Sequence, residues 1–378
     1  MISSAYIHIP FCEHICHYCD FNKVFLKNQP VGEYLSLLKK EMELTLREFP
    51  TDRLNTIFVG GGTPTSLNAG QLAELCGAVS STLPFEPSEV EYTFEANPGD
   101  LSEEKLAVLK ENGVNRLSFG VQSFNDELLK KIGRTHCAKD VFSTIEKART
   151  AGFENISIDL IYALPGQTLE DFQETLRTAM TLDLPHFSGY SLIIEPKTVF
   201  YNLMQKGRLS LPPQESEAAM FEVLMEEMEK HGYRQYEISN FAKPGYESRH
   251  NLTYWNNEAY YGFGAGAHSY LSKTRRANFG PLKKYFAPLK ENRLPVIEEN
   301  PVTVREQMEE EMFLGLRKTQ GVSIEGFYEK FRKPMMDVFG EEIEKEKKLG
   351  RLVSENGRIR LTQQGKFLGN EVFQSFLK

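Results

Sequence analysis

Apolar residues recur along this chain with two different periods. Over residues 31–49 they return at every third or fourth position, which is the period of an amphipathic helix. Short, nearly continuous apolar runs separate such stretches and predict buried strands. The predicted strands span residues 5–9, 56–59, 91–95, 116–119, 156–161 and 187–194.

Predicted helices fill the gaps between these strands, at residues 31–49, 69–83, 101–112, 125–132, 138–151 and 169–182. This alternation indicates parallel strands joined by right-handed crossovers. Six strands are fewer than the eight that close a full barrel. The sequence therefore predicts an α/β fold in which residues 1–195 form a partial six-stranded (β/α)6 barrel.

The rest of the chain has a different pattern. Residues 196–300 combine a predicted helix at 215–231 with irregular segments, which we expect to cover the open side of the barrel. Residues 301–378 predict three helices and a hairpin that turns at Asn356-Gly357, a strong type I′ turn signal. This order resembles a winged-helix-like α+β module. Acidic residues in its third helix favour a packing role over DNA binding.

Composition narrows the class of protein. The chain has 378 residues, of which 40% are hydrophobic and 25% are charged, the profile of a soluble globular protein. A net charge of −8 argues against a nucleic-acid partner. No charge-free apolar run is long enough for a transmembrane segment, and no leader-like segment is present. With an odd number of cysteines, these features predict a cytoplasmic protein.

Three of the five cysteines follow the first predicted strand, which Pro10 ends because proline cannot donate to a sheet. Cys12, Cys16 and Cys19 have the spacing Cys-x3-Cys-x2-Cys. Thiolates this close together can hold one soft metal centre. A four-iron four-sulfur cluster fits three cysteines when its fourth iron takes an outside ligand.

Two other interpretations of the cysteines remain open at this point. Zinc needs four ligands, and His14 and His17 are interleaved among the cysteines. The cysteines could also be buried or disulfide-linked, but such tight spacing strains disulfides, and Cys76 and Cys137 are isolated.

A glycine-rich element, Gly60-Gly-Gly62-Thr-Pro64-Thr65, follows the second predicted strand. Glycines there let the backbone approach a ligand closely. The element lacks the Gly-Lys-Ser/Thr ending of a P-loop and the spacing of a dinucleotide-binding fingerprint. A tight strand-to-helix turn is the alternative.

Polar residues recur at or just past the carboxyl ends of the predicted strands, at Glu95, Asn97, Gln122 and Asp159. In barrels this edge carries the active site. Glu95 and Asp159 can accept hydrogen bonds from ribose hydroxyls or an ammonium group, and Arg134 can hold a carboxylate. Any one of them alone would be a loop residue or a cap, whereas several on successive strands favour a shared site.

The cysteine spacing resembles the signature of radical S-adenosylmethionine enzymes. Five segments resemble, in register, the oxygen-independent coproporphyrinogen III oxidase family within it. They are His8-Ile-Pro-Phe-Cys12, Gly60-Gly-Gly-Thr-Pro-Thr65, Phe94-Glu-Ala-Asn-Pro98, Ser118-Phe-Gly-Val-Gln-Ser123 and Asp159-Leu-Ile-Tyr-Ala-Leu-Pro-Gly166. The resemblance implies the partial barrel and a four-iron four-sulfur cluster on the three cysteines.

The resemblance also implies residues that bind S-adenosylmethionine. The family positions that contact the cluster-bound molecule match Tyr6, Tyr18, Gly61, Glu95 and Arg134. Those that contact a second molecule match Gly62, Thr63, Gln122 and Asp159.

Two features bear on the activity. The oxidases have a fourth cysteine two residues after the third, where this chain has Phe21, and this chain also starts almost at its first strand.

The segment His250-Asn251-Leu-Thr-Tyr254-Trp255 resembles the signature of HemW-type heme chaperones. Because imidazole is a natural axial ligand of heme iron, we expect His250 to bind heme, with His268 and His136 as rivals. A hydrogen-bonded structural histidine is the alternative.

The sequence thus predicts a cytoplasmic heme chaperone, free in solution or peripheral to the membrane, whose cofactors are a four-iron four-sulfur cluster, S-adenosylmethionine and heme. Its expected partners are apo-hemoproteins, such as membrane-bound respiratory cytochromes. The alternative is an oxygen-independent coproporphyrinogen III oxidase that decarboxylates two propionates. A zinc-stabilised interaction protein is a third possibility.

Overall fold

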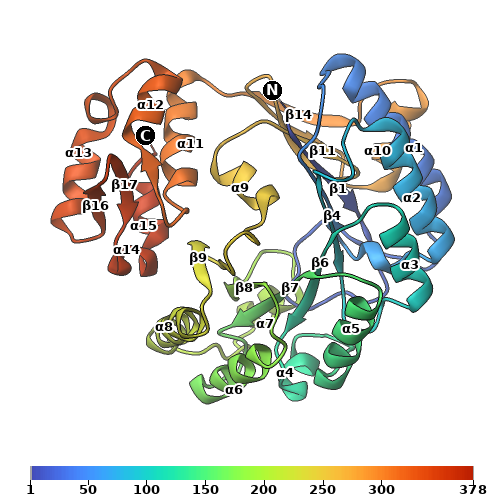
Figure 1. The fold of residues 1–378 in the computed structure, drawn as a ribbon, viewed down its shortest axis with the longest axis horizontal. Coiled ribbons are helices and arrows are strands. Elements are labelled where there is room, and N and C mark those ends of the chain that lie inside the picture. Colours follow the sequence, from blue (N-terminus) through green and yellow to red (C-terminus); the bar gives the residue numbers. More distant parts are fainter. Residues whose placement is uncertain (1, 378) are drawn as a thin grey trace.

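The structure is a computed structural model that describes residues 2–377. Its centre is a run of six parallel strands that lie side by side in chain order (Figure 1). They are β1 (Ser4–Ile9), β4 (Thr56–Gly61), β5 (Glu91–Ala96), β6 (Arg116–Gln122), β7 (Asn155–Tyr162) and β8 (His186–Ser191). The predicted six-stranded partial barrel is therefore confirmed.

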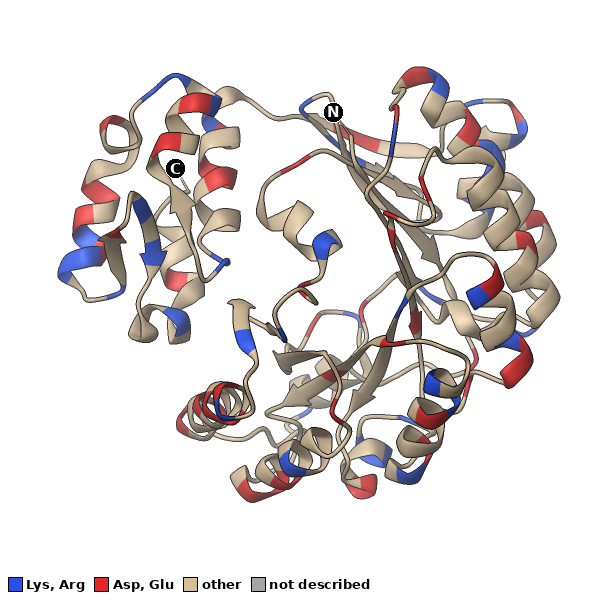
Figure 2. Cartoon of the chain, in the orientation of Figure 1, with Lys and Arg blue, Asp and Glu red and all other residues tan. Residues whose placement is uncertain are grey.

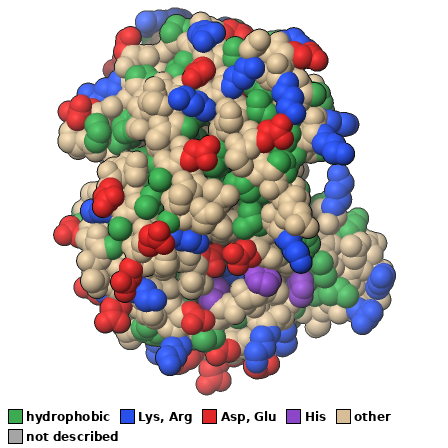
Figure 3. Space-filling model, turned by 90° about the vertical axis from the view of Figure 1, so that its right-hand side faces the viewer, with side chains coloured by type: hydrophobic (Ala, Val, Ile, Leu, Met, Phe, Trp, Pro, Cys, Tyr) green, Lys and Arg blue, Asp and Glu red, His purple; other side chains and the backbone are tan. Residues whose placement is uncertain are grey.

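Helices cover the outer face of these strands (Figure 1). They are α1 (Val31–Glu48), α2 (Ala69–Thr82), α3 (Glu103–Glu111), α4 (Asp126–Lys131), α5 (Ala138–Thr150) and α6 (Leu169–Met180). Asn68 and Thr168 begin α2 and α6 with capping boxes, which satisfy backbone N–H groups at each helix start. Acidic and basic side chains are interspersed on these helices (Figure 2), and the helix-covered side in Figure 3 has the same mixture.

Residues 196–300 contain more strands and helices than the single helix with irregular segments that the sequence predicts. Beside β1 lies the parallel strand β11 (Tyr260–Phe263), followed by three antiparallel strands. These are β12 (His268–Leu271), β13 (Thr274–Asn278) and β14 (Val296–Pro301). At the other edge, β10 (Asn240–Ala242) and β9 (Arg234–Glu237) extend the sheet beyond β8. Hydrophobic periodicity did not reveal these strands because most are short and β13 is largely polar.

The same segment contributes four helices, α7 (Val199–Gln205), α8 (Gln214–Lys230), α9 (Arg249–Trp255) and α10 (Leu282–Lys290). Of these, α9 lies on the concave side of the sheet, between the barrel strands and the C-terminal helices (Figure 1). No helix within residues 2–377 is long and apolar enough to cross a membrane.

The C-terminal residues contain the three predicted helices and the hairpin. The helices are α11 (Val304–Gly315), α12 (Ile324–Phe331) and α13 (Met335–Lys348), and the hairpin strands are β16 (Leu352–Glu355) and β17 (Arg358–Leu361). Asn356 and Gly357 both have positive φ, as a type I′ turn requires. A short strand β15 (Val322–Ser323) joins the hairpin, and helices α14 (Gln363–Phe367) and α15 (Gly369–Gln374) follow it. Met312, Phe339 and Phe376 belong to a hydrophobic core separate from that of the barrel.

A buried carboxylate ties α1 to the strands added beyond β1. Glu41 accepts hydrogen bonds from the hydroxyl of Tyr285 at 2.5 Å, from Nδ2 of Asn278 at 2.5 Å and from the backbone N–H of Gly264 at 2.8 Å. Burial raises the pKa of Glu41 from its ordinary value of 4.5 to about 7, although these donors oppose the shift.

This pKa predicts how stability depends on pH. Because the pKa of Glu41 is higher in the folded than in the unfolded chain, its stabilising contribution is complete below pH 4.5 and is lost as the pH rises through 7. The full loss is roughly 3 kcal/mol. Relative to Glu41→Gln, the wild-type melting temperature should therefore fall between pH 5 and pH 8. Glu43→Gln, which removes a half-buried carboxylate from the same helix, is the control. A wild-type advantage that grows with pH would contradict the prediction.

Candidate functional site

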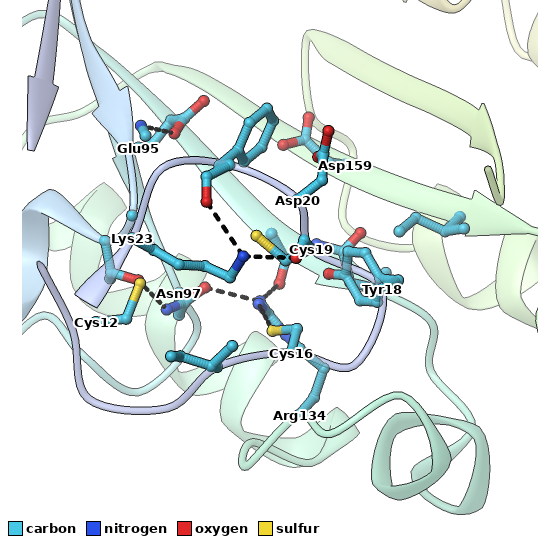
Figure 4. A pocket seen from close by; sticks show the side chains of 18 of the residues that line it. Cys12, Cys16, Tyr18, Cys19, Asp20, Lys23, Glu95, Asn97, Arg134 and Asp159 are labelled. Atoms are coloured by element: carbon cyan, nitrogen blue, oxygen red, sulfur yellow. Dashed lines mark hydrogen bonds between the residues drawn. The ribbon is translucent and has the colours of Figure 1, made fainter. Parts of the chain in front are cut away.

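The cysteine loop starts where β1 ends. Strand β2 (Phe11–Cys12) pairs with β3 (Val24–Phe25), so the base of the loop is closed and Cys16 and Cys19 lie on the part between. Lys23 stabilises the part of the loop that leads back to β3. Its Nζ donates to the carbonyl oxygens of Cys19 at 2.6 Å and Phe21 at 3.1 Å (Figure 4).

The three cysteines line one cavity of about 410 Å³ at the carboxyl edge of the parallel strands. Other predicted residues line the same cavity, namely Tyr18, Gly61, Gly62, Thr63, Glu95, Gln122, Arg134 and Asp159. All predicted site residues except Tyr6 and His250 are thus brought together. Its volume is typical of a small-molecule site.

The glycine-rich element lets the backbone pass closely between the cysteine loop and Glu95. Gly61 has a φ of +111°, and its N–H donates to Oε2 of Glu95 at 3.0 Å. A Cβ atom on Gly60 would lie 2.6 Å from the same carboxylate oxygen, and one on Gly62 would lie 2.8 Å from the carbonyl oxygen of Phe11. Side chains at these positions would therefore displace the loop or the carboxylate.

Arg134 and Asn97 connect the cysteine loop to the strand ends (Figure 4). Nη1 of Arg134 donates to Sγ of Cys16 at 3.4 Å, and its Nη2 donates to Oδ1 of Asn97 at 2.8 Å. Asn97 donates in turn to Thr63, whose hydroxyl donates to Sγ of Cys12 at 3.7 Å. Donors directed at sulfur stabilise thiolates, which are the form that binds metal.

Two carboxylates, those of Glu95 and Asp159, belong to the wall of the cavity. Burial raises the pKa of Glu95 to about 7, with a further contribution from the negative charge of Asp159. Burial also raises the pKa of Asp159, which the hydroxyls of Ser188 and Ser118 partly offset. Two carboxyl groups in one enclosed wall favour a ligand that brings positive charge or hydroxyl groups.

The donor set fits a cluster better than a single metal ion. Within residues 2–377, no group of three or more His, Cys, Asp or Glu side chains lies close enough to hold one ion. Zinc needs all its ligands within about 2.3 Å of one point, whereas a four-iron cluster presents separate irons to separate cysteines. His17 is also occupied, because its Nδ1 is hydrogen-bonded to the carbonyl oxygen of Lys131 at 2.9 Å. All five cysteines are free, so the disulfide interpretation is wrong.

Tyr6 does not line the cavity, and its expected contact with the cofactor stays a prediction. Its ring is stacked against Phe58, and its hydroxyl is hydrogen-bonded to Nδ1 of His8 at 3.0 Å. Strand β1 alternates its side chains between the two faces of the sheet, and Tyr6 packs among other aromatic rings on the concave face.

His250 has structural hydrogen bonds in this structure, and its predicted role as a heme ligand stays a prediction. Its Nδ1 is hydrogen-bonded to Oγ1 of Thr56 at 2.8 Å and its Nε2 to the hydroxyl of Tyr254 at 2.9 Å. The ring is 1% exposed and stacks on Phe58. Burial lowers the pKa of His250 to about 3, so the ring is neutral and both nitrogens are already used.

Neither rival histidine lies in the cavity wall. His136 is buried, and its Nε2 is hydrogen-bonded to the carbonyl oxygen of Val121 at 3.1 Å. His268 is exposed at the start of β12.

Trp255, the last residue of the His-Asn-x-x-Tyr-Trp segment, and Asn256 after it connect the barrel to the C-terminal module. Trp255, at the end of α9, lies under the guanidinium of Arg317, whose Cζ is 4.5 Å from the centre of the indole ring. Asn256 accepts a hydrogen bond from Lys318 at 2.5 Å. This segment therefore acts in packing between two parts of the fold.

The strand order and the cysteine-lined cavity at the carboxyl edge define the class of radical S-adenosylmethionine proteins. Residues 6–179 match the radical SAM superfamily, and residues 302–368 match the HemN C-terminal domain. Membership of the superfamily implies a four-iron four-sulfur cluster and S-adenosylmethionine, and the cavity fits both.

More specific relatives are heme chaperones. The chain is 57% identical to heme chaperone HemW of Bacillus subtilis, over 100% of this chain and 99% of the relative. It is 48% identical to HemW of Lactococcus lactis, over 99% of this chain and 97% of that one. The chain belongs to the HemW family.

A solved structure confirms the fold. Coproporphyrinogen III oxidase (HemN) of Escherichia coli, a radical SAM enzyme, superimposes with a TM-score of 0.86 and 24% identity, over 99% of this chain and 90% of the oxidase.

The hydrogen bonds of His250 predict a structural phenotype for its removal. His250→Ala leaves Thr56 and Tyr254 without buried partners and opens a cavity beside Phe58. We expect a loss of about 2 to 3 kcal/mol, seen as a lower melting temperature, with the heme absorption spectrum retained. His268→Ala, at an exposed position, should leave the melting temperature unchanged. Unchanged stability together with a lost heme spectrum would restore His250 as a ligand.

Proposed function

We propose that this protein is a heme chaperone that delivers heme to apo-hemoproteins. The observation that carries the proposal is its end-to-end identity of 57% with a heme chaperone, in a chain whose predicted cofactor residues line one cavity. In the proposal, Cys12, Cys16 and Cys19 hold the four-iron four-sulfur cluster. When bound, the reduced cluster supplies the electron for reductive cleavage of S-adenosylmethionine.

The residues around the cluster position have separate proposed roles. Arg134 supports the thiolate of Cys16, to which it donates a hydrogen bond, and it can also face the carboxylate of the cofactor. Gly61 allows the backbone to approach the cofactor, and Glu95 accepts hydrogen bonds from its amino group or ribose. Tyr18 belongs to the cysteine loop, and its side chain lines the cavity (Figure 4).

The remaining wall supports a second molecule of S-adenosylmethionine. Gly62, Thr63, Gln122 and Asp159 line the same cavity, and we assign them to that molecule. Gln122 has a φ of +67°, an uncommon conformation for a residue other than glycine, and its side chain is buried in the wall.

We further propose respiratory apo-cytochromes as acceptors, with transfer in the cytoplasm or at its membrane surface. Five free cysteines and an oxygen-sensitive cluster support a reducing compartment. The alternative oxidase activity has less support, because Phe21 occupies the position of the fourth cysteine of the oxidases, and the likeness to the solved oxidase is one of fold.

The proposal predicts the outcome of a heme titration. Anaerobically reconstituted protein should bind heme stoichiometrically, as followed by the Soret band, and should pass it to an apo-cytochrome. Incubation with coproporphyrinogen III should yield no protoporphyrinogen IX. The absence of saturable heme binding, or turnover of coproporphyrinogen III, would contradict the chaperone function.

The pKa of Glu95 predicts a pH dependence of cofactor binding. As the pH rises from 6 to 7.5, Glu95 ionises through its pKa of about 7 and becomes a better acceptor for the amino group and hydroxyls of S-adenosylmethionine. The affinity, measured by equilibrium dialysis, should rise severalfold over this range. Glu95→Gln should bind more weakly with a flatter profile, whereas Glu111→Gln, on the outer surface, should match wild type. An unaltered profile in Glu95→Gln would remove this role.

A further inference from the structure

A buried arginine lies in the barrel below the cysteine cavity. Arg116 is the first residue of β6 and is 2% exposed. Successive residues of a strand point to opposite faces of a sheet, so Arg116 shares its face with Ser118 and Gly120. Both of these residues line the cavity, whereas Arg116 does not. Arg116 therefore lies on the cavity side of the sheet but deeper than the wall, where a bound cofactor does not touch it.

The charge of Arg116 is not used by a close ion pair. The ion pairs that arginines form within residues 2–377 do not include Arg116. Its Nε is buried and has no hydrogen-bond partner in the same part of the chain. A guanidinium stays protonated at neutral pH, and a buried charge is costly unless opposite charge compensates it. We therefore looked for carboxylates that face Arg116 over a longer distance.

The two carboxylates of the cavity wall provide this opposite charge. Burial raises the pKa of Glu95 and of Asp159, and the charge of Arg116 acts on both in the opposite direction. Glu95 pairs in register with Ser118, whose hydroxyl donates to Oδ1 of Asp159 at 3.5 Å. Both carboxylates thus lie beside the residue two positions after Arg116. Glu91, on the same face, is instead hydrogen-bonded to backbone N–H groups at the start of α9.

Other titratable groups face the two carboxylates but cannot replace Arg116. Three tyrosines do so, and burial raises the pKa of each, so they are neutral; they are Tyr6 and Tyr254 near Glu95, and Tyr190 near Asp159. Arg134 also lowers the pKa of Asp159, but its guanidinium is hydrogen-bonded to Cys16 and Asn97 on the other side of the cavity.

The histidines near Arg116 are neutral as well. Burial lowers the pKa of His186 and of His250, and the charge of Arg116 lowers both further. Both nitrogens of each ring are hydrogen-bonded to hydroxyl groups. These rings add no charge beside the guanidinium, so Arg116 is the fixed cation that balances the carboxylates from below.

We propose that Arg116 is a positioning residue for S-adenosylmethionine, which it does not touch: its charge keeps Glu95 and Asp159 ionised, so that both can accept hydrogen bonds from the cofactor. Without this cation, two carboxyl groups in one enclosed wall would retain a proton at neutral pH. The inference rests on the proposed assignment of Glu95 and Asp159 to the cofactor, and it adds a residue that the cavity wall does not contain.

The test is the pH profile of S-adenosylmethionine binding to cluster-loaded protein, measured by equilibrium dialysis with iron and sulfide content matched between variants. Arg116→Met and Arg116→Gln both remove the charge, one with an apolar and one with a polar side chain. Each should raise the midpoint of the profile by about one pH unit. Binding should then be about fivefold weaker than in wild type at pH 7, but no more than about twofold weaker at pH 8.5.

Two further variants separate charge from packing. Arg116→Lys retains a cation, so its midpoint should lie between those of wild type and Arg116→Met. Arg276→Met is the matched control, because Arg276 is also largely buried but forms its ion pairs with Glu48 and Glu299, away from the cavity. This variant should keep the wild-type midpoint even if its melting temperature falls.

The same effect should be visible without cofactor. The infrared band of a protonated buried carboxyl group, assigned to Glu95 by its loss in Glu95→Gln, should disappear at a higher pH in Arg116→Met than in wild type. This readout does not depend on the cluster or on S-adenosylmethionine.

The outcomes separate this inference from the assignment on which it rests. If wild-type protein binds no S-adenosylmethionine, the cofactor assignment and the inference both fail. If wild-type protein binds it and the folded Arg116→Met and Arg116→Gln variants keep the wild-type midpoint, the inference alone is overturned. Equal weakening at pH 7 and pH 8.5, or the same shift in Arg276→Met, would assign Arg116 a structural role and would likewise overturn it.

Discussion

The buried carboxylate of Glu91 holds the start of α9, a helix on the concave side of the barrel (Figure 1). Its two oxygens accept hydrogen bonds at 3.0 Å from the backbone N–H groups of Arg249 and His250, which lie in the first turn of α9. A carboxylate is well suited to this position because the N–H groups at a helix start are unpaired and carry partial positive charge. Since α9 is only seven residues long, its start also determines where its other side chains lie.

Side chains of α9 then contact both the barrel interior and the C-terminal module. His250 pairs with Thr56 on β4, and it orients the hydroxyl of Tyr254. At the opposite end, Trp255 packs against Arg317. Residues of this segment therefore take part in hydrogen bonding inside the barrel and in packing against the C-terminal module.

The cysteine cavity depends on a different part of the sheet. Parallel strands end at the same edge, so residues that are far apart in sequence share one wall. Glycines at the end of β4 let Glu95 approach the backbone, and Arg134 reaches Cys16 from the loop after α4. Glu95, Asn97 and Asp159 make the wall polar, which suits a charged cofactor.

The sequence by itself determined the six parallel strands, the cysteine loop and most of the cavity wall. Those features depend on local periodicity and on motifs at strand ends, whose neighbours follow from the parallel topology. Only the tertiary structure showed the hydrogen bonds of His250, because its partner Thr56 is 194 positions away. It alone also showed the polar strand β13, which pairs with its neighbours through backbone groups rather than apolar side chains. A hydrogen-bond partner or the exposure of a side chain depends on packing between distant segments, and hydrophobic periodicity contains no information about it.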